Sequence, residues 1–143
     1  MKQKVVRRSC PLVAVFKGTK YATLWIWFGP CFEYVPYEFR RRIFLTFWED
    51  VVKRSRFWDR LLHCKWKGYG EAIRAEIEDF LQGRSGFILP FSVPGPCSSP
   101  AQQFSIGSVD MHLPAEKELV EEFLPKLLKL LEEEAQPQPG TYA

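Results

Sequence analysis

The stretch from Tyr21 to Phe28 alternates between two kinds of side chain, and this alternation constrains the fold more than any other feature. Successive residues of a β-strand point to opposite faces of a sheet. One face would carry Ala22, Leu24, Ile26 and Phe28, which is typical of a core, and the other Tyr21, Thr23, Trp25 and Trp27. The second face suits either another core layer or a platform on which bases stack.

A change of the apolar period from two to 3.6 predicts a helix that begins at Tyr37, just after Pro36. Its apolar residues cover a wide arc, formed by Phe39, Ile43, Phe44, Phe47, Trp48, Val51 and Val52. Cations lie between and after them, namely Arg40, Arg41, Arg42, Lys53, Arg54, Arg56 and Arg60. They are either a solvated face or a surface that contacts phosphates.

The remaining elements are predicted from shorter patterns. Strands are expected at residues 4–8, 12–16, 32–35, 87–93 and 104–113, the last with a bulge at Gly107. Residues 57–63 are expected either to continue the helix that begins at Tyr37 or to form a short second one, and a further helix is expected at 71–82. A final helix is predicted to open at Pro114, with Glu116 in its first turn, and to be kinked or split by Pro125. The tail from 136 to 143 is expected to be disordered.

A length of 143 residues matches one typical domain with a hydrophobic core. The pattern predicts a single α+β domain over residues 1–135, with an antiparallel sheet and amphipathic helices packed on one face. An arrangement of two related β-β-α halves stays open, because strands followed by a long amphipathic helix occur twice along the chain.

Charge is divided unevenly along the chain. Residues 1–70 hold 15 Lys and Arg against 5 Asp and Glu, a balance of +10. The second half, from 71 to the end, holds 5 against 12, so its balance is −7 and the whole chain carries +3. Two interpretations remain open: a basic surface for an acidic partner, or two halves that neutralise one another.

Signatures of chemistry are absent from the sequence. Cys10, Cys31, Cys64 and Cys97 are widely spaced without a C-x-x-C pair, so no metal site and no cofactor is predicted. The sequence contains no G-x-S-x-G, no P-loop, no H-E-x-x-H and no dinucleotide fingerprint. We therefore predict no catalytic residues and no enzymatic activity.

The apolar stretch near the N-terminus is interrupted by Lys17, which makes it too short for a signal-peptide core or a membrane span. No membrane association is predicted, and the expected location is cytoplasmic or nuclear.

Two further segments are candidates for binding. In Lys65-Trp66-Lys67-Gly68-Tyr69-Gly70, the rings could stack a base, although a plain interhelix loop explains the segment as well. The last helix carries a leucine-rich half-surface that either seals the sheet or forms a self-association seam. Its candidate interaction residues are Leu119, Phe123, Leu127, Leu130 and Leu131.

Two junctions in the chain share one pattern, a strand that meets a proline before a helix. They are Phe32-Glu33-Tyr34-Val35-Pro36-Tyr37-Glu38 and Val109-Asp110-Met111-His112-Leu113-Pro114-Ala115-Glu116. In this pattern the chain resembles the PUR repeat, a unit of antiparallel strands followed by one helix, over residues 12–54 and 87–131. The resemblance implies binding of single-stranded DNA or RNA on the sheet face, with Lys17, Lys20, Trp25 and Trp27 at the matching positions.

The leading functional prediction is binding of single-stranded nucleic acid with little sequence preference. Rings would stack bases and cations would contact phosphates; the predicted residues are Lys17, Lys20, Tyr21, Trp25, Trp27, Arg40, Arg41, Arg42, Lys53, Arg54, Lys65, Trp66 and Lys67. The alternative is an adaptor or accessory subunit that docks on a protein partner, or on a second copy of itself, through the aromatic face and the leucine-rich helix.

Overall fold

The computed structural model describes residues 11–28, 37–92, 103–107 and 109–135. In chain order the elements are β1 (Leu12–Lys17), β2 (Tyr21–Trp27), α1 (Tyr37–Asp50), η2 (Val52–Arg54), α2 (Arg56–Leu62), η3 (Trp66–Gly68), α3 (Tyr69–Leu81), β3 (Ile88–Ser92), β4 (Gln103–Ile106), β5 (Asp110–Glu116) and α4 (Lys117–Ala135). The strands predicted at 4–8 and 32–35 and the tail predicted from 136 lie outside the described residues.

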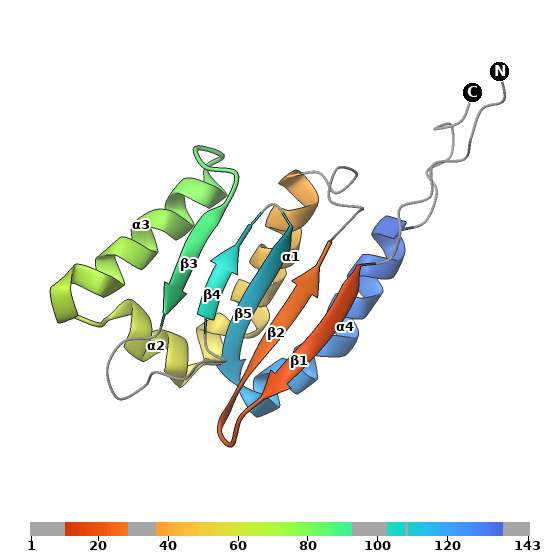
Figure 1. Cartoon of the computed structure of the whole chain (residues 1–143), viewed down its shortest axis with the longest axis horizontal. Coiled ribbons are helices and arrows are strands. Elements are labelled where there is room, and N and C mark those ends of the chain that lie inside the picture. Colours follow the sequence, from red (N-terminus) through yellow and green to blue (C-terminus); the bar gives the residue numbers. More distant parts are fainter. Residues whose placement is uncertain (1–10, 29–36, 93–102, 108, 136–143) are drawn as a thin grey trace, which may run out of the picture.

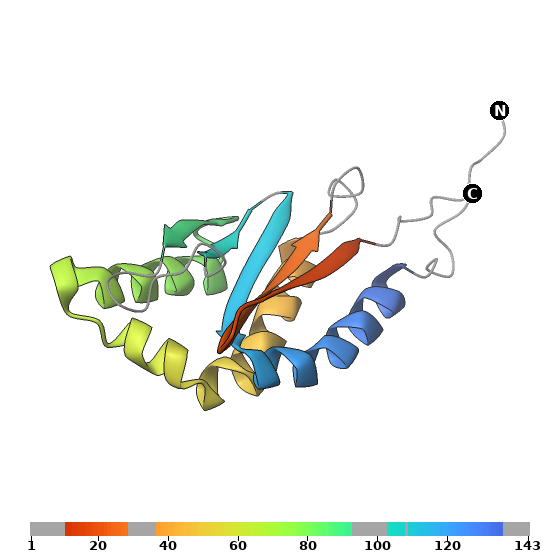
Figure 2. The ribbon, with the colours of Figure 1, turned by 60° about the horizontal axis from the view of Figure 1, so that its bottom comes forward.

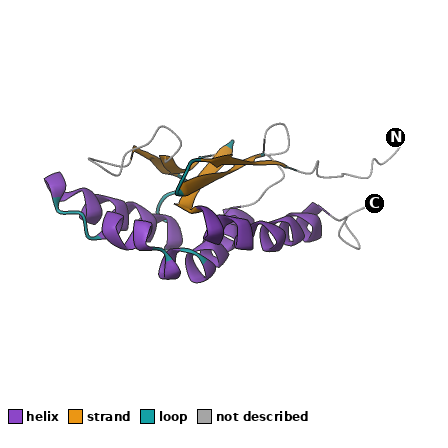
Figure 3. Ribbon diagram, turned by 90° about the horizontal axis from the view of Figure 1, so that it is seen from below, coloured by secondary structure: helices purple, strands orange, loops and turns teal. Residues whose placement is uncertain are grey.

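The five strands form one antiparallel sheet in the order β1-β2-β5-β4-β3 (Figure 1). Figure 3 shows the sheet as one layer and the helices as a second layer along one of its faces. The α+β class with helices on one face is therefore confirmed. The opposite face of the sheet carries no described helix, and we call it the open face.

The core lies between the sheet and the helices. Ala22, Leu24, Ile26 and Phe28 are all at most 1% exposed, which confirms the core face predicted from the alternation. Their register partners on β5 are equally buried, namely Met111, Leu113 and Ala115. The apolar arc of α1 is also confirmed, because its members are buried except for Trp48, which is half-buried.

The two hairpins of the sheet are related by an approximate twofold axis. Adding 89 to the residue numbers of β2 gives those of β5, and the pair Leu24–Leu113 lies at the centre of their register. The connecting turns match too, since the N–H of Gly18 donates to Tyr21 O at 2.7 Å and that of Gly107 donates to Asp110 O at 2.8 Å. The axis therefore relates the β1–β2 hairpin to the β4–β5 hairpin.

Each hairpin is followed along the chain by a long helix, and the two helices lie side by side under the sheet. Phe44 of α1 contacts Phe104 of β4 with 5.8 Å between ring centroids, while α4 packs against β2 and β5. The phenyl rings of Phe47 and Phe123 join the two helices at 5.5 Å. Each helix thus covers strands of the other half, and the two halves share one core.

The prediction of one strand from 104 to 113 was wrong, because this stretch forms two strands, β4 and β5, joined by a tight turn. The apolar residues continue on both sides of the turn, so they read as one strand with a bulge at Gly107. A signal was present in the sequence, since Gly107-Ser108-Val109 has the same glycine-hydroxyl start as Gly18-Thr19-Lys20, the segment between β1 and β2.

The predicted helix start at Pro114 was also wrong. Pro114 lies inside β5 opposite Thr23, Glu116 ends that strand, and α4 begins at Lys117. A proline removes an N–H donor, which normally excludes it from an inner strand. Here β5 pairs with β4 only at His112 and Met111, so the missing N–H falls beyond the last paired residue of β4.

The helix α4 runs as one element from Lys117 to Ala135 with Pro125 inside it, so the chain is not split there. Its apolar side is turned toward the sheet and α1, with Val120, Phe123, Leu127 and Leu131 at most 2% exposed. Of the two roles predicted for this leucine-rich surface, sealing the sheet is the one that the structure shows.

The start of α3 depends on Gly70, which packs directly against the end of α2. A Cβ at this position would lie 2.5 Å from the Leu62 carbonyl oxygen and 2.8 Å from that of Cys64. We therefore expect Gly70→Ala to lower the free energy of unfolding by about 1–3 kcal/mol, since backbone must move to make room. Urea denaturation followed by circular dichroism measures this.

Gly86→Ala is the matched control, because a Cβ at Gly86 would meet nothing within 4 Å. Equal urea midpoints for the two variants would contradict the close approach of α2 and α3 at Gly70.

Candidate functional site

The open face is aromatic and nearly free of charge. By the pairing register it carries Leu12, Ala14 and Phe16 of β1, Tyr21, Thr23, Trp25 and Trp27 of β2, and Asp110, His112 and Pro114 of β5. Of these, Thr23 and Pro114 are buried, and the Tyr21 ring packs on Phe57 of α2 with 5.2 Å between centroids. Leu12 and Phe16 are 56% and 51% exposed. A surface with this much accessible apolar area is typical of a binding site for another molecule.

The two tryptophans of β2 lie stacked side by side on this face. Their ring centroids are 6.4 Å apart with 15° between the planes, and Phe16 lies 6.3 Å from Trp25. The indole N–H of Trp25 donates to Asp110 Oδ2 at 3.0 Å, which fixes the ring across the β2–β5 pair. Trp25, Trp27 and Phe16 therefore form one cluster of rings, which we call the aromatic platform.

Polar groups beside the platform are already engaged or covered. His112 Nδ1 and Ser105 Oγ lie at hydrogen-bond distance, 3.0 Å. Thr23 is 1% exposed, and its hydroxyl has no hydrogen-bond partner among the described residues. The open face thus offers ring surfaces to a ligand rather than a set of free hydrogen-bonding groups.

Cations without an acidic partner among the described residues gather at one end of the sheet. The β1–β2 turn supplies Lys17 and Lys20, α2 supplies Arg56 and Arg60, and α4 begins with Lys117, whose N–H donates to Lys20 O at 3.0 Å. Arg60 reaches the Tyr21 hydroxyl at 3.5 Å. We call Lys17, Lys20, Arg56, Arg60 and Lys117 the hairpin-end cluster; Figure 1 shows the turn and the start of α4 at its lower edge.

Glu116 holds α2 at this end of the sheet. Its carboxylate accepts hydrogen bonds from the Ser55 hydroxyl at 2.5 Å and from the backbone N–H groups of Arg56 and Phe57 at 2.9 and 3.0 Å. Ser55 in turn caps α2 by accepting from Trp58 N at 3.1 Å. Because these donors use the carboxylate, Glu116 does not pair with a cation of the hairpin-end cluster.

The sequence indicated Arg56 and Arg60 only as part of the basic stretch that follows α1, and it missed Lys117. They come from two helices that only the tertiary fold brings beside the β1–β2 turn. The +10 balance of the first half was the one available signal, and it does not say which cations lie together.

The predicted cations of α1 and η2 lie in the helix layer, away from the open face. Three ion pairs connect α1 and the residues after it to α4: Arg42–Glu133 at 3.3 Å, Arg54–Glu122 at 3.5 Å and Lys126–Asp50. Lys53 pairs with Glu49 at 2.9 Å. The basic and acidic parts of the chain therefore neutralise one another in this layer, as the second interpretation of the charge pattern holds.

Two arginines of α1 have structural tasks as well. Arg40 donates to the carbonyls of Gly86 and Gly107 at 2.9 and 3.3 Å, and Arg41 donates to Leu81 O at 3.1 Å. Burial lowers the pKa of the Arg40 guanidinium, and the nearby Tyr37 opposes this. These hydrogen bonds hold α1 against the loops around α3 and β4, so the two guanidinium groups are not free to bind a ligand.

Lys65, Trp66 and Lys67 form a third, separate location, at the corner between α2 and α3. The Trp66 ring is 54% exposed, with Lys67 Nζ 4.8 Å from its centroid and Tyr69 5.9 Å away. Two strands, β5 and β4, separate the β2 tryptophans from β3, the strand that α3 packs against. The structure therefore does not bring Trp66 together with Trp25 and Trp27.

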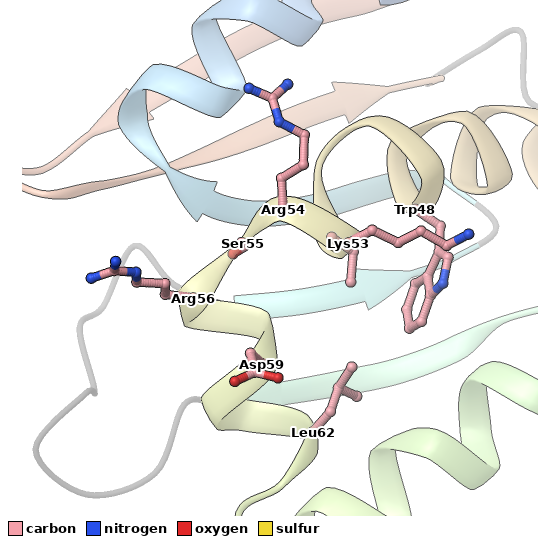
Figure 4. Close-up of a pocket in the computed structure, with 8 residues that line it drawn as sticks. Trp48, Lys53, Arg54, Ser55, Arg56, Asp59 and Leu62 are labelled. Carbon is pink, nitrogen blue, oxygen red and sulfur yellow. The ribbon is translucent and has the colours of Figure 1, made fainter.

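A cavity of about 380 Å3 opens on the helix side between η2 and α2. Figure 4 shows Trp48, Lys53, Asp59 and Leu62 around it, while the guanidinium groups of Arg54 and Arg56 point away from it in different directions. The cations at its rim thus do not converge on one point, and no ligand chemistry is defined there.

The candidate interaction residues of α4 are mainly internal. Phe123, Leu127, Leu130 and Leu131 are at most 9% exposed, and Leu119 is half-buried. They pack against the sheet and α1, so their side chains are not available to a partner in this structure.

Among the described residues, no three His, Cys, Asp or Glu side chains gather into a possible metal site. None of the described helices combines the length and the apolar composition needed to cross a bilayer. Comparisons of the chain with protein-family models, with curated proteins and with solved structures found no match. The PUR-repeat resemblance thus stays a prediction.

Proposed function

We propose that the protein binds single-stranded nucleic acid, DNA or RNA, on the open face, without covalent chemistry. The observation that carries this proposal is that Phe16, at one end of the aromatic platform, lies next to the β1–β2 turn, where the hairpin-end cluster gathers. Bases stack on Phe16, Trp25 and Trp27, at roughly 1–3 kcal/mol for each ring. Phosphates are contacted by cations that make no ion pair within the described residues.

This proposal replaces the predicted combination of aromatic strand and basic helix. Arg42 and Arg54 lie in the helix layer and pair with Glu133 and Glu122, whereas Lys17 and Lys20 lie at the β1–β2 turn and make no ion pair with the described residues. Low sequence preference follows, because every base has a ring face and few free hydrogen-bonding groups accompany the rings. Such a partner places the protein in the cytoplasm or the nucleus.

A salt titration with two matched double variants tests the proposal. We expect Lys17→Gln with Lys20→Gln to weaken binding of a mixed-sequence single-stranded oligonucleotide. It should also reduce the slope of log K against log salt by about 1.4, since each phosphate contact contributes about 0.7. Fluorescence anisotropy of a labelled oligonucleotide measures both quantities.

Lys53→Gln with Lys129→Gln removes the same charge from exposed positions of η2 and α4 and should leave the slope unchanged. Phe16→Ala should weaken binding at every salt concentration without changing the slope, because it removes a ring and no charge. If the full chain fails to bind the oligonucleotide at low salt, or if both double variants change the slope equally, the proposal is wrong.

A second candidate is docking of a protein on the same face. The observation that favours it is the exposure of apolar side chains, Leu12 and Phe16 on β1 and Leu89 on β3, on a surface with little charge. A protein complex of this kind would depend on shape and would weaken little as salt rises. The same salt titration distinguishes the two candidates.

A further inference from the structure

The outer edge of β1 is one of the two free edges of the sheet among the described strands. β1 is an end strand, and no described strand pairs with its outer side (Figures 1 and 2). Its sequence, Leu12-Val13-Ala14-Val15-Phe16-Lys17, carries no charge before its last residue, no proline and no bulge. An apolar edge without such protection is a template for another strand.

The hydrogen-bond pattern identifies the free groups. The N–H of Gly18 donates to Tyr21 O, so the pairs Phe16–Thr23, Ala14–Trp25 and Leu12–Trp27 exchange bonds with β2 in alternation. The N–H and C=O groups of Val13, Val15 and Lys17 therefore point outward, away from the rest of the sheet. These groups need a partner strand or water.

The twofold relation of the hairpins shows how an edge like that of β1 can be paired. β4 corresponds to β1, and the outer side of β4 is paired with β3 in antiparallel fashion. The β3 edge that results is interrupted by Pro90 and by a register shift between Ile88 and Phe91. One edge of the sheet is thus covered and blunted by the chain itself, and the β1 edge has no such cover among the described residues.

We propose that β1 pairs antiparallel with β1 of a second copy of this chain, about a twofold axis at Ala14. Residues that face each other across antiparallel strands lie on the same side of the sheet. In a pair of identical strands, the two residue numbers of each facing pair are therefore both odd or both even. The twofold axis must then pass through a residue and not between two residues. An axis at Ala14 sets Leu12 against Phe16 of the second copy, and Val13 against its Val15. All these pairs are apolar, and the two exposed apolar side chains of β1, Leu12 and Phe16, lie side by side across the axis.

The nearest alternative register is less favourable. An axis at Val15 would place Val13 against Lys17 of the second copy and Leu12 against its Gly18. That arrangement sets a charged side chain against a valine and leaves Leu12 without an apolar partner. The strand is therefore self-complementary at Ala14, which is why a second copy, rather than an unrelated peptide, is the occupant that fits.

Charge at residue 14 tests the axis, because this residue faces itself. In the proposed pairing, Ala14 and its copy form a pair without mutual hydrogen bonds, with about 4.5 Å between Cα atoms. Ala14→Glu and Ala14→Lys should each raise the dissociation constant of the dimer about fivefold or more at low salt. An equimolar mixture of the two variants should dimerise, with a dissociation constant about 25-fold below that of either variant alone.

Sedimentation velocity of the full chain over a concentration series measures these constants, and far-ultraviolet circular dichroism confirms folding. The same substitutions at Leu89, 58% exposed on β3 at the other edge, are the control and should leave the wild-type behaviour. A wild-type chain that stays monomeric overturns the proposal. So does a dimer whose dissociation constant is the same for both variants and their mixture.

If the Ala14 variants do not fold, a second pair of variants tests the same twofold axis. Leu12→Lys with Phe16→Glu places opposite charges across the twofold axis and should dimerise, whereas Leu12→Lys with Phe16→Lys should stay monomeric. Both side chains are more than half exposed, so each chain should fold. Equal association of the two double variants would exclude the axis at Ala14.

Discussion

Replacing Trp58 with alanine should lower the free energy of unfolding by about 3–5 kcal/mol, the largest effect that we expect from a single substitution. Trp58 is 0% exposed and lies at the centre of the aromatic core. Its ring packs edge-on against Phe104 at 4.9 Å and against Phe47 at 6.4 Å. Alanine would leave a cavity among residues of α1, α2 and β4, which the helix layer cannot close without moving.

Part of this effect comes from one hydrogen bond. The indole N–H of Trp58 donates to Pro114 O at 2.5 Å, and both groups are buried. Trp58→Phe keeps most of the ring but leaves that carbonyl without its donor, so we expect a loss of about 1–3 kcal/mol.

Chemical denaturation followed by circular dichroism measures both Trp58 variants. Trp66→Ala is the control and should change stability by at most about 0.5 kcal/mol, because that ring is 54% exposed. Equal losses for Trp58→Ala and Trp66→Ala would show that Trp58 does not hold the layers together.

Replacing Glu116 with alanine should cost about 2–4 kcal/mol, because three donors lose one charged acceptor. The Ser55 hydroxyl is buried, and the N–H groups of Arg56 and Phe57 belong to the first turn of α2. Negative charge at this point also complements the helix dipole. Glu116→Gln keeps one carbonyl acceptor and should lose roughly half as much.

Glu118→Ala is the matched control for Glu116, because Glu118 is exposed in the first turn of α4 and makes no hydrogen bond or ion pair with the described residues. Its effect should stay within about 0.5 kcal/mol. The denaturation midpoints of the two variants measure this difference in stability. A Glu116→Ala variant as stable as Glu118→Ala would contradict the role of Glu116 in holding α2 against β5.

The parts of the fold predicted correctly are those determined by local periodicity. The alternation from Ala22 to Phe28 identified the core face, and the 3.6-residue spacing identified α1 with its buried arc. Pro114 was misassigned because a strand position is possible for it only where no neighbouring strand needs its N–H. That condition depends on where the pairing of β4 with β5 ends, and the local sequence does not show this. A proline before an amphipathic helix reads as the first residue of that helix unless the strand pairing is known.

The candidate site was predictable only where its residues are close in sequence. Lys17, Lys20 and Trp25 belong to one hairpin, and the structure keeps them together. Arg42 and Arg54 were assigned to the same surface, but they lie in the helix layer and pair with Glu133 and Glu122. Sequence spacing shows that a helix is amphipathic, but it does not show which face of the sheet the helix covers.

The approximate twofold axis also sets the order in which the chain can fold. Each hairpin closes across a three-residue turn, a process of about 1–10 μs. The central pair of the sheet instead joins Leu24 to Leu113, which are 89 positions apart. Loop closure over that distance costs more entropy, so the two hairpins should form before the sheet is joined.

During synthesis this separation becomes a delay. At about 5–20 residues per second, β5 leaves the ribosome roughly 4–18 s after β2. Through that interval the β1–β2 hairpin has two free edges and an uncovered apolar face, since α4 and β5 are not yet made. The nascent chain therefore exposes an apolar hairpin for seconds before the strand and the helix that cover it are made.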